Sequence, residues 1–395
     1  MHYKYVIVGG GMTGDAAIGG IREVDTDGSI ALFGDESEVP YNRPHLSKGL
    51  WHEKSLDDIQ RDTNRDGVDL HLGRRIEGLD LDGKSVTDDQ GASYTFDKLL
   101  LATGGSPRRL PFGGDSVIYF RTVDDYRRLR ALADSGDEFL VIGGGFIGSE
   151  IVASLSHNDK RVTMVFPEPS IGSSIYPADL SSFLNDYYRE HGVKVLSGHV
   201  VSNVETRGDR VTVTVTSNDS SDSREIVVDG VVAGLGIEPN VELARKAGLN
   251  VDDGISVDGN LNACHPDVYA AGDVANYCND VLERRIRVEH EDSANTMGAA
   301  AGKAMAGAGE PFSNVPYFWS DMFDLGYEVM GHIDSGMETV ADWKDEFKEG
   351  VVYYLEGTRV RGVLLWNMWD RWGPAGDLVA DVGPHTPADL MGRIR

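Results

Sequence analysis

Two glycine-rich segments contain the residues of this sequence whose spacing suits chemistry with phosphates. The first segment reads Gly9-x-Gly11-x-x-Gly14 and the second reads Gly143-x-Gly145-x-x-Gly148, about 135 residues further on. In such a motif the first glycine permits a tight turn and the second lets the backbone approach a pyrophosphate. The third lets the following helix pack closely against the preceding strand. We call these segments the first and the second glycine loop.

Each glycine loop needs a strand before it, a helix after it and a carboxylate at the end of the next strand. Before the first loop, Tyr5–Val8 has the apolar character of a buried strand, and Phe139–Ile142 repeats this before the second. Asp35 follows Gly14 by 21 residues, and Glu168 follows Gly148 by 20. A carboxylate at this spacing binds ribose hydroxyls. One copy of the motif is weak evidence, but two complete copies predict two dinucleotide sites.

The remaining sequence predicts the elements that hold these sites. Valine and threonine alternate over 211–215, and this segment and the run 227–233 are expected to continue the second sheet, whereas 217–224 is a polar hairpin tip. Aromatic-rich strands follow residue 312. We predict an α/β fold with two Rossmann-like dinucleotide-binding domains, similar to glutathione reductase, and a small C-terminal α+β domain. The expected boundaries are 1–115 with 249–311 for the first domain, 116–248 for the second and 312–395 for the third.

Composition narrows the possible functions. Hydrophobic residues make up 41% of the 395 residues, which is typical of a folded protein. An apolar run begins at Tyr5, so a signal peptide is not expected, and no apolar run approaches the roughly 20 residues of a membrane span. Two cysteines, Cys264 and Cys278, provide no disulfide framework. We therefore expect a soluble cytoplasmic protein.

The charge is strongly negative. Acidic residues number 64 against 37 basic ones, which gives a net charge of −27. Such a surface repels nucleic acids and anionic membranes. Because salt screens the repulsion between like charges, the composition favours a salt-adapted, halophile-like protein.

Two dinucleotide sites in one chain indicate hydride transfer between two cofactors, and the natural pair is a flavin with a nicotinamide. Ala102-Thr103-Gly104 and Ala271-Gly272-Asp273 resemble the paired return segments of two-dinucleotide flavoprotein reductases. This resemblance covers essentially the whole chain. It implies that the first glycine loop binds FAD and the second binds NAD(P)H.

Further segments resemble one branch of that superfamily, the ferredoxin-reductase-like and apoptosis-inducing-factor-like flavoproteins. They are Pro40-Tyr-Asn-Arg-Pro-His-Leu-Ser-Lys48, Arg287-Val-Glu-His-Glu-Asp292, Tyr317-Phe-Trp-Ser-Asp321 and Gly326-Tyr-Glu328. In the first segment His45 replaces a proline of the family pattern. A role in cell death is not carried over from the animal member of this branch.

The resemblance, together with the glycine loops, implies the following site residues. Those expected to bind FAD are Gly9, Gly11, Met12, Thr13, Gly14, Asp35, Arg43, Lys48, Ile76, Thr103, Gly104, Arg121, Gly272, Asp273, His290, Glu291 and Trp319. Those expected to bind NAD(H) are Gly143, Gly145, Phe146, Ile147, Gly148, Glu168, Gly236 and Glu328. Lys48 is expected to pair with Glu150, and these two are the candidate catalytic residues, because a cation near the flavin stabilises the charge that arrives with a hydride.

The residues after Glu168 favour NADH over NADPH. A 2′-phosphate calls for arginine or lysine beside the ribose carboxylate, and Pro169 to Gly172 contain neither. Lys160 and Arg161 precede the strand and are the cations that could fold nearby. No metal-site spacing of cysteine and histidine is present. The cysteines lie near the Gly272-Asp273 segment, and we favour buried, inert thiols over the alternative that one of them approaches the flavin.

The electron acceptor stays open between ferredoxin or rubredoxin, a quinone and oxygen. A basic patch for docking an acidic carrier is expected at Arg74-Arg75 and Arg284-Arg285-x-Arg287. One alternative function is a redox sensor that forms a long-lived charge-transfer complex with NADH and changes its dimerisation. Another is a cysteine-dependent disulfide reductase or NADH oxidase, against which the missing redox thiol argues. A homodimer is compatible with all three functions.

Overall fold

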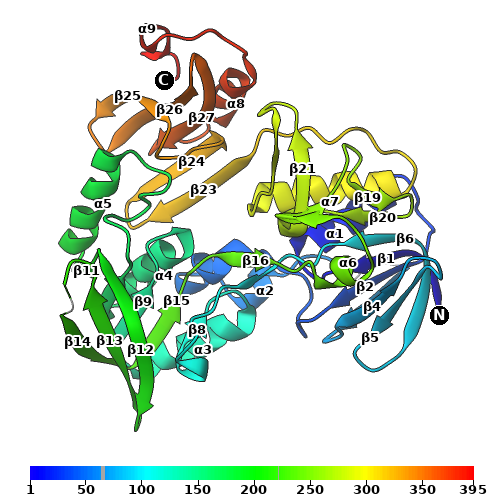
Figure 1. The fold of residues 1–395 in the computed structure, drawn as a ribbon, viewed down its shortest axis with the longest axis horizontal. Helices are drawn as coiled ribbons and strands as arrows, with labels where there is room; N and C mark the ends of the chain where they lie inside the picture. Colours follow the sequence, from blue (N-terminus) through cyan, green and yellow to red (C-terminus); the bar gives the residue numbers. More distant parts are fainter. Residues whose placement is uncertain (64–66, 221) are drawn as a thin grey trace. The chain divides into compact units, whose positions relative to one another are not determined.

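The computed structural model describes residues 1–63, 67–220 and 222–395 (Figure 1). The chain forms two compact units. The first consists of Met1–Arg43, Ser55–Ser106 and Glu238–Phe318, and the second of Pro44–Lys54, Pro107–Ile237 and Trp319–Arg395. The three-domain division predicted from the sequence is finer than this and stays a prediction.

A sheet of eight strands forms the centre of the first unit, with the path β19-β20-β6-β1-β2-β3. Strand β5 pairs antiparallel with β6, and β4 pairs antiparallel with β5. Strands β20, β6, β1, β2 and β3 are parallel. The bounds are β1 (His2–Val8), β2 (Ile30–Gly34), β3 (Val68–Leu72), β4 (Ile76–Asp80), β5 (Ser85–Asp88), β6 (Ser93–Leu101), β19 (Asn262–His265) and β20 (Val268–Ala270).

Helices α1 (Met12–Arg22) and α7 (Glu291–Met305) lie side by side in this unit (Figure 1). The smaller elements are α2 (Leu56–Ile59), α6 (Glu242–Lys246) and the sheet β17 (Val251–Asp252), β18 (Gly254–Ser256), β21 (Ala275–Asn279) and β22 (Arg284–Ile286). The 3-10 turn η4 (Gly272–Val274) belongs to this unit, η2 (Gly49–Trp51) and η3 (Gly114–Ser116) belong to the second unit, and η1 (Arg43–Leu46) crosses a boundary between the two units. Strand β7 (Gly105–Pro107) pairs with β16 (Ile237–Pro239).

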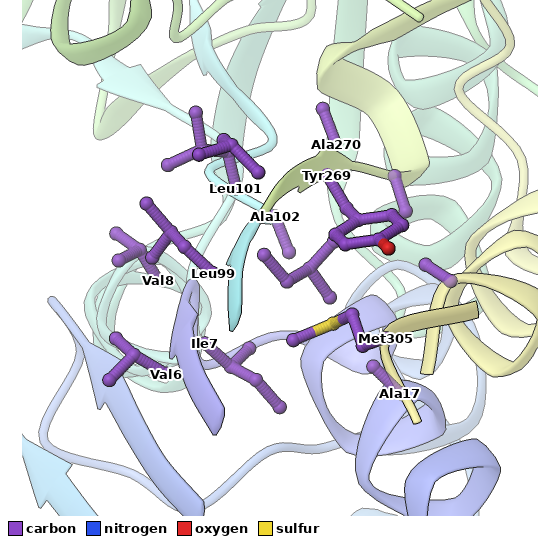
Figure 2. Close-up of a cluster of buried hydrophobic side chains, with 14 of the residues drawn as sticks. Val6, Ile7, Val8, Ala17, Leu99, Leu101, Ala102, Tyr269, Ala270 and Met305 are labelled. Atoms are coloured by element: carbon purple, nitrogen blue, oxygen red, sulfur yellow. The ribbon is translucent and has the colours of Figure 1, made fainter. Parts of the chain in front are cut away.

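The core of the first unit lies where the parallel strands meet the two helices (Figure 2). Val6 of β1 is paired with Leu99 of β6 and with Ala31 of β2, and all three residues are buried. Met305 of α7 belongs to the same cluster. Strands that are buried on both faces consist of continuous apolar residues, which is the pattern that the sequence shows before the first glycine loop.

The second unit repeats the arrangement with a five-stranded parallel sheet in the order β11-β10-β9-β15-β8. Its elements are β8 (Ile118–Tyr119), α3 (Val123–Ser135), β9 (Glu138–Ile142), α4 (Phe146–His157), β10 (Arg161–Val165), α5 (Ala178–Glu190), β11 (Lys194–Leu196) and β15 (Gly230–Ala233). A separate antiparallel sheet holds β12 (His199–Arg207), β13 (Arg210–Ser217) and β14 (Ser223–Val228).

Our expectation that 211–215 continues the second parallel sheet is therefore wrong. Strand β13 pairs with antiparallel neighbours on both sides, and its alternation reflects one face turned to a core: Val211, Val213 and Val215 are buried there, whereas Thr214 and Thr216 are partly exposed. Only β15, at the end of the predicted run 227–233, joins the parallel sheet.

The C-terminal part of the second unit is built on a five-stranded antiparallel sheet in the order β23-β24-β27-β26-β25. Its elements are β23 (Tyr317–Met322), β24 (Leu325–Gly331), β25 (Glu338–Asp345), β26 (Glu349–Glu356), β27 (Arg359–Trp366), α8 (Trp372–Ala380) and α9 (Pro387–Leu390). Two Rossmann-like modules and a small α+β module are thus confirmed as the fold class. Among the described residues, no helix has both the length and the apolar character that crossing a membrane requires.

Candidate functional site

The outer glycines of the first glycine loop are required by the packing of the protein itself. Gly9 has φ +134°, and a Cβ there would lie 2.0 Å from the carbonyl oxygen of Ala102. A Cβ at Gly14 would lie 2.2 Å from the carbonyl oxygen of Gly9. A Cβ at Gly11, in contrast, would meet no described atom within 4 Å. The middle glycine therefore borders open space in front of the loop.

The second glycine loop has the same geometry. Gly143 has φ +116°, and a Cβ there would lie 2.3 Å from the carbonyl oxygen of Gly234. A Cβ at Gly148 would lie 2.1 Å from the carbonyl oxygen of Gly143, and again a Cβ at the middle glycine, Gly145, would meet no described atom within 4 Å. Two segments 134 residues apart in numbering thus create the same backbone surface.

These two surfaces fit the pyrophosphate of a dinucleotide. Gly11 and Gly145 are the N-cap residues of α1 and α4, and neither helix has a side-chain cap. The first-turn N–H groups of a helix have no partner within the helix, and the helix dipole makes this end attractive to anions. A phosphate can approach because the middle residue has no Cβ. The residues present therefore fit a dinucleotide such as FAD or NAD(H) at each loop.

The acidic residue predicted to bind the first ribose is already held by an arginine. Asp35 follows β2, and its carboxylate accepts from Nε of Arg75 at 3.2 Å and from Nη2 at 2.5 Å. Both side chains are exposed, so this pair adds little to stability. It does fix the direction of the carboxylate. Ile76, another predicted FAD residue, is buried beside Arg75 at the start of β4.

The return segment of the first unit is held by Asn240. The Thr103 hydroxyl donates to the carbonyl of Asn240 at 2.7 Å, and the Asn240 amide donates back to the carbonyl of Thr103 at 2.8 Å. Gly104 has φ +61°, which allows the chain to turn there. A Cβ at Gly272 would lie 2.3 Å from Oγ1 of Thr13, so the second return segment contacts the start of α1.

Two predicted FAD residues of the first unit, Arg43 and His290, lie near a third, Asp273. Burial acts to lower the pKa of each of the two, and the Asp273 carboxylate opposes this effect. Arg43 also donates to Glu36 at 2.7 Å. The imidazole of His290 stacks on Phe318 with 4.1 Å between the ring centroids. Burial lowers the pKa of His290 to about 4, against an opposing effect of Asp273, so this ring is neutral at pH 7. His290 is therefore no source of positive charge.

The predicted catalytic pair forms within the second unit. Lys48 Nζ lies 2.6 Å from Oε1 of Glu150, and the two side chains are only 13% and 5% exposed. Nζ also lies 4.7 Å from the ring centroid of Trp319. The Ser47 hydroxyl donates to the other carboxylate oxygen of Glu150 at 2.6 Å. The ammonium is thus held in one place by a carboxylate and an aromatic face.

Glu168, the predicted ribose-binding residue of the second unit, lies in the loop after the carboxyl end of β10 and is exposed. Two contacts hold its loop: Gly198 donates its N–H to the carbonyl of Glu168 at 3.0 Å, and the Asn218 amide donates to the carbonyl of Pro167 at 2.8 Å. Lys160 and Arg161 are at the opposite end of β10, so the suggestion that they fold near Glu168 is wrong. They pair with Asp137 and Glu138 instead.

The structure divides the remaining predicted residues between the units. The first unit holds Met12, buried in the first turn of α1, and Glu291, in the first turn of α7. The second unit holds Phe146, Ile147, Gly236, Glu328 and Arg121. Ile147 is 39% exposed on α4, whereas Glu328 is buried in β24. These roles in binding stay predictions.

The expectation that the cysteines are buried is wrong, and the expected basic patch is found only in part. Cys264 and Cys278 are exposed rather than buried. The expected basic patch is reduced, because Arg74, Arg75 and Arg287 pair with carboxylates. Arg284 and Arg285 stay exposed, and Arg285 keeps its charge while it donates to the backbone carbonyls of Val257 and Asn276. An arginine that satisfies a local backbone carbonyl cannot be distinguished from a surface arginine by sequence spacing.

Several polar residues in contact with the predicted site carry no sequence signal of their own. Ser47, Ser320, Asn218 and Asn240 are isolated polar residues whose partners lie up to 170 residues away. Only the family segments that contain Ser47 and Ser320 pointed toward two of them. Among the described residues, no group of three or more histidine, cysteine or acidic side chains could hold a metal ion.

Comparison with known proteins gives two family matches. Residues 3–300 match the model described as pyridine nucleotide-disulphide oxidoreductase. Residues 301–344 match the model described as apoptosis-inducing factor, mitochondrion-associated, C-term.

Individual relatives extend over nearly the whole chain. The ferredoxin–NAD(+) reductase component of the anthranilate 1,2-dioxygenase system from Burkholderia cepacia is 32% identical, over 98% of this chain and 96% of its own. Mitochondrial apoptosis-inducing factor 1 from Dictyostelium discoideum is also 32% identical, over 95% of this chain and 78% of its own. Among solved structures, putidaredoxin reductase in its covalent complex with putidaredoxin is 28% identical and has a TM-score of 0.90, covering 98% of this chain and 95% of that chain.

Proposed function

Because the chain belongs to the pyridine nucleotide-disulphide oxidoreductase family, we propose that it is an FAD-dependent NADH oxidoreductase that passes electrons to a small ferredoxin-type carrier. The observation that carries this proposal is the duplicated glycine loop, with the same open space at Gly11 and at Gly145. When bound, FAD accepts a hydride from the nicotinamide and releases the electrons to an acceptor.

The residues of the chain then have distinct tasks. The first glycine loop, Asp35 and Asp273 hold FAD, and the second glycine loop and Glu168 hold the nicotinamide nucleotide. Lys48 supplies positive charge where negative charge develops during hydride transfer. Glu150 keeps that ammonium in place with a 2.6 Å contact. Since burial keeps His290 neutral at pH 7, the positive charge is assigned to Lys48 rather than to the histidine.

The preference for NADH rests on the surroundings of Glu168. A carboxylate at this point binds the ribose 2′-hydroxyl of NADH and repels the 2′-phosphate of NADPH. The nearest cations in sequence, Lys160 and Arg161, are at the other end of β10 and pair with acidic residues there. Residues 166–177, which follow β10, contain no lysine or arginine that could pair with a phosphate, and Gly198 and Asn218 hold two carbonyls of this loop.

The identity of the acceptor rests on the relatives. One is the ferredoxin reductase component of a dioxygenase system, and a similar structure was solved in complex with putidaredoxin. A ferredoxin or a rubredoxin is therefore the proposed acceptor. A quinone and oxygen are the competing acceptors that the experiment must include.

The test uses the purified protein in about 2 M KCl, where repulsion among its acidic side chains is screened. We expect bound FAD, reduction of the flavin by NADH much faster than by NADPH under anaerobic stopped flow, and reoxidation by ferredoxin or rubredoxin faster than by a quinone or oxygen. Protein without flavin would refute the FAD assignment. Equal rates with NADPH would refute only the role given to Glu168.

A redox sensor is the second candidate, and the match of residues 301–344 to the apoptosis-inducing-factor C-terminal model favours it. In that case NADH would reduce the protein, air would reoxidise it slowly, and no acceptor would give appreciable turnover. A cysteine-dependent oxidase or disulfide reductase is a weaker alternative, because the two exposed cysteines contact Asn250 and Arg285 rather than Lys48. Full activity of the Cys278→Ser and Cys264→Ser variants would exclude it.

A further inference from the structure

The carboxylate of Glu150 has a third hydrogen-bond donor that the catalytic pair does not explain. The Ser320 hydroxyl of β23 donates to Oε1 at 2.5 Å, on the same oxygen that receives Lys48. Ser320 and Glu150 are both buried. A buried carboxylate that accepts from Lys48, Ser47 and Ser320 has its charge compensated by one cation and two dipoles, which is how a buried charge avoids a large desolvation cost.

Ser320 is itself the end of a chain of hydroxyl groups. Tyr327 of β24 is hydrogen bonded to Ser320 and to Tyr176, and all three side chains are buried. A serine hydroxyl has one proton, and an ionised carboxylate can only accept. Ser320 must therefore give its proton to Glu150 and accept from Tyr327, which in turn accepts from Tyr176. The direction of every hydrogen bond in this chain is set by the charge of Glu150.

Burial of the two tyrosines favours the same direction of these hydrogen bonds. It raises the pKa of Tyr327 and of Tyr176 well above the usual value, so both phenols keep their protons at any working pH. Phenols that stay protonated can serve only to donate along the chain or to accept from the next hydroxyl. The two phenols therefore stay hydrogen-bond donors: Tyr176 donates to Tyr327, and Tyr327 donates to Ser320, which donates to Glu150.

The chain of hydroxyls also borders the second glycine loop. Ser320, Tyr327 and Tyr176 line a cavity of about 120 Å³, and Gly145 and Phe146 line the same cavity. The polar groups that support Glu150 therefore lie on the wall of the space next to the proposed nicotinamide nucleotide site. Every residue involved belongs to the second unit.

We propose that Ser320 and Tyr327 are positioning residues for hydride transfer, which hold the Glu150 carboxylate in the orientation that keeps Lys48 in place. This inference rests on the proposed function, because it assigns these two residues to the hydride-accepting step. Neither residue needs to touch a cofactor. Their effect reaches the reaction through the contact between Glu150 and Lys48.

The test compares Ser320→Ala and Tyr327→Phe with wild type and with the control Tyr354→Phe. Tyr354 is also a buried tyrosine of the same sheet, but its hydroxyl has no hydrogen-bond partner among the described residues. Anaerobic stopped flow with NADH separates the limiting rate of flavin reduction from the NADH dissociation constant. We expect the limiting rate to fall about tenfold in Ser320→Ala and less in Tyr327→Phe, as for loss of one hydrogen bond to a charged group. The dissociation constant and the FAD content should not change.

Infrared spectroscopy of the oxidised holoprotein distinguishes positioning from a general loss of structure. The carboxylate band of Glu150, identified by its absence in Glu150→Gln, should shift in Ser320→Ala, because the carboxylate loses a hydrogen-bond donor. If both variants match Tyr354→Phe in rate and infrared spectrum, the proposal is wrong. If wild type itself is not reduced by NADH, the proposed function is wrong, whereas the infrared comparison still tests the link to Glu150.

Discussion

The middle glycines of the two loops allow a paired test of which loop binds which cofactor. A Cβ at Gly11 or Gly145 would meet no described atom within 4 Å, so alanine should be tolerated by the fold at both positions. That Cβ would enter the space assigned to a phosphate, whose oxygen should lie about 2.9 Å from a backbone nitrogen. Losing one such charge-assisted hydrogen bond costs about 1.5–3 kcal/mol, which corresponds to roughly 10- to 150-fold in affinity.

The expected results differ between the variants. Gly11→Ala should fold but bind FAD at least about tenfold more weakly, whereas Gly145→Ala should keep its FAD and require at least about tenfold more NADH. FAD titration of the apoprotein and stopped-flow reduction measure the two affinities. Gly14→Ala is the control for misfolding, since its Cβ would lie 2.2 Å from the carbonyl oxygen of Gly9. Wild-type FAD affinity in a folded Gly11→Ala, or loss of FAD in Gly145→Ala, would refute the assignment of the loops, and valine at Gly11 or Gly14 should give colourless protein.

Three further results are expected. Glu168→Ala should raise the NADH requirement and leave the flavin content intact, and unchanged kinetics would move the nicotinamide nucleotide away from β10. Because the pKa of His290 is lowered from 6.5 to about 4, its unfolded form binds a proton that the folded form rejects as the pH falls. The free energy of unfolding should therefore fall by up to about 3 kcal/mol between pH 7 and pH 4, and urea denaturation of His290→Gln should show a smaller loss. With a net charge of −27, the melting temperature should rise between about 0.1 and 2 M KCl, and a fall would show that screened ion pairs dominate.

The sequence was sufficient to predict the backbone surfaces of the site, because those surfaces depend on local spacing. Gly9 and Gly14 touch each other through a turn of six residues, and the same is true of Gly143 and Gly148. The strand before each loop is buried on both faces and therefore consists of apolar residues without alternation. Requirements of this kind involve residues that are close together in the sequence, so the sequence pattern shows them.

The side-chain contacts of Glu150 could not be predicted in this way. Ser320 and Tyr327 reach it from strands more than 150 residues later in the chain. In β24 all seven residues from Leu325 to Gly331 are buried, so Tyr327 is read as an ordinary core residue and its hydroxyl leaves no pattern. Asn218 was likewise read as part of a polar hairpin tip, although its amide holds the loop of Glu168. Polar contacts between distant segments depend on tertiary packing, which spacing does not encode.

The strong negative charge of this protein is unfavourable for binding an acidic electron carrier. Ferredoxin-type carriers are usually steered to a reductase by opposite charge. In this chain Arg75 pairs with Asp35, and Arg287 pairs with Asp253 and Glu289, whereas Arg284 and Arg285 are exposed and keep their charge. Two exposed arginines are a small attraction beside a net charge of −27, so we expect an acidic carrier to be repelled overall at low ionic strength. At molar salt the screening length falls to about 3 Å, so long-range repulsion and steering both disappear and short-range contacts select the partner. The rate of carrier reduction should therefore rise with salt for an acidic carrier and fall with salt for a basic one.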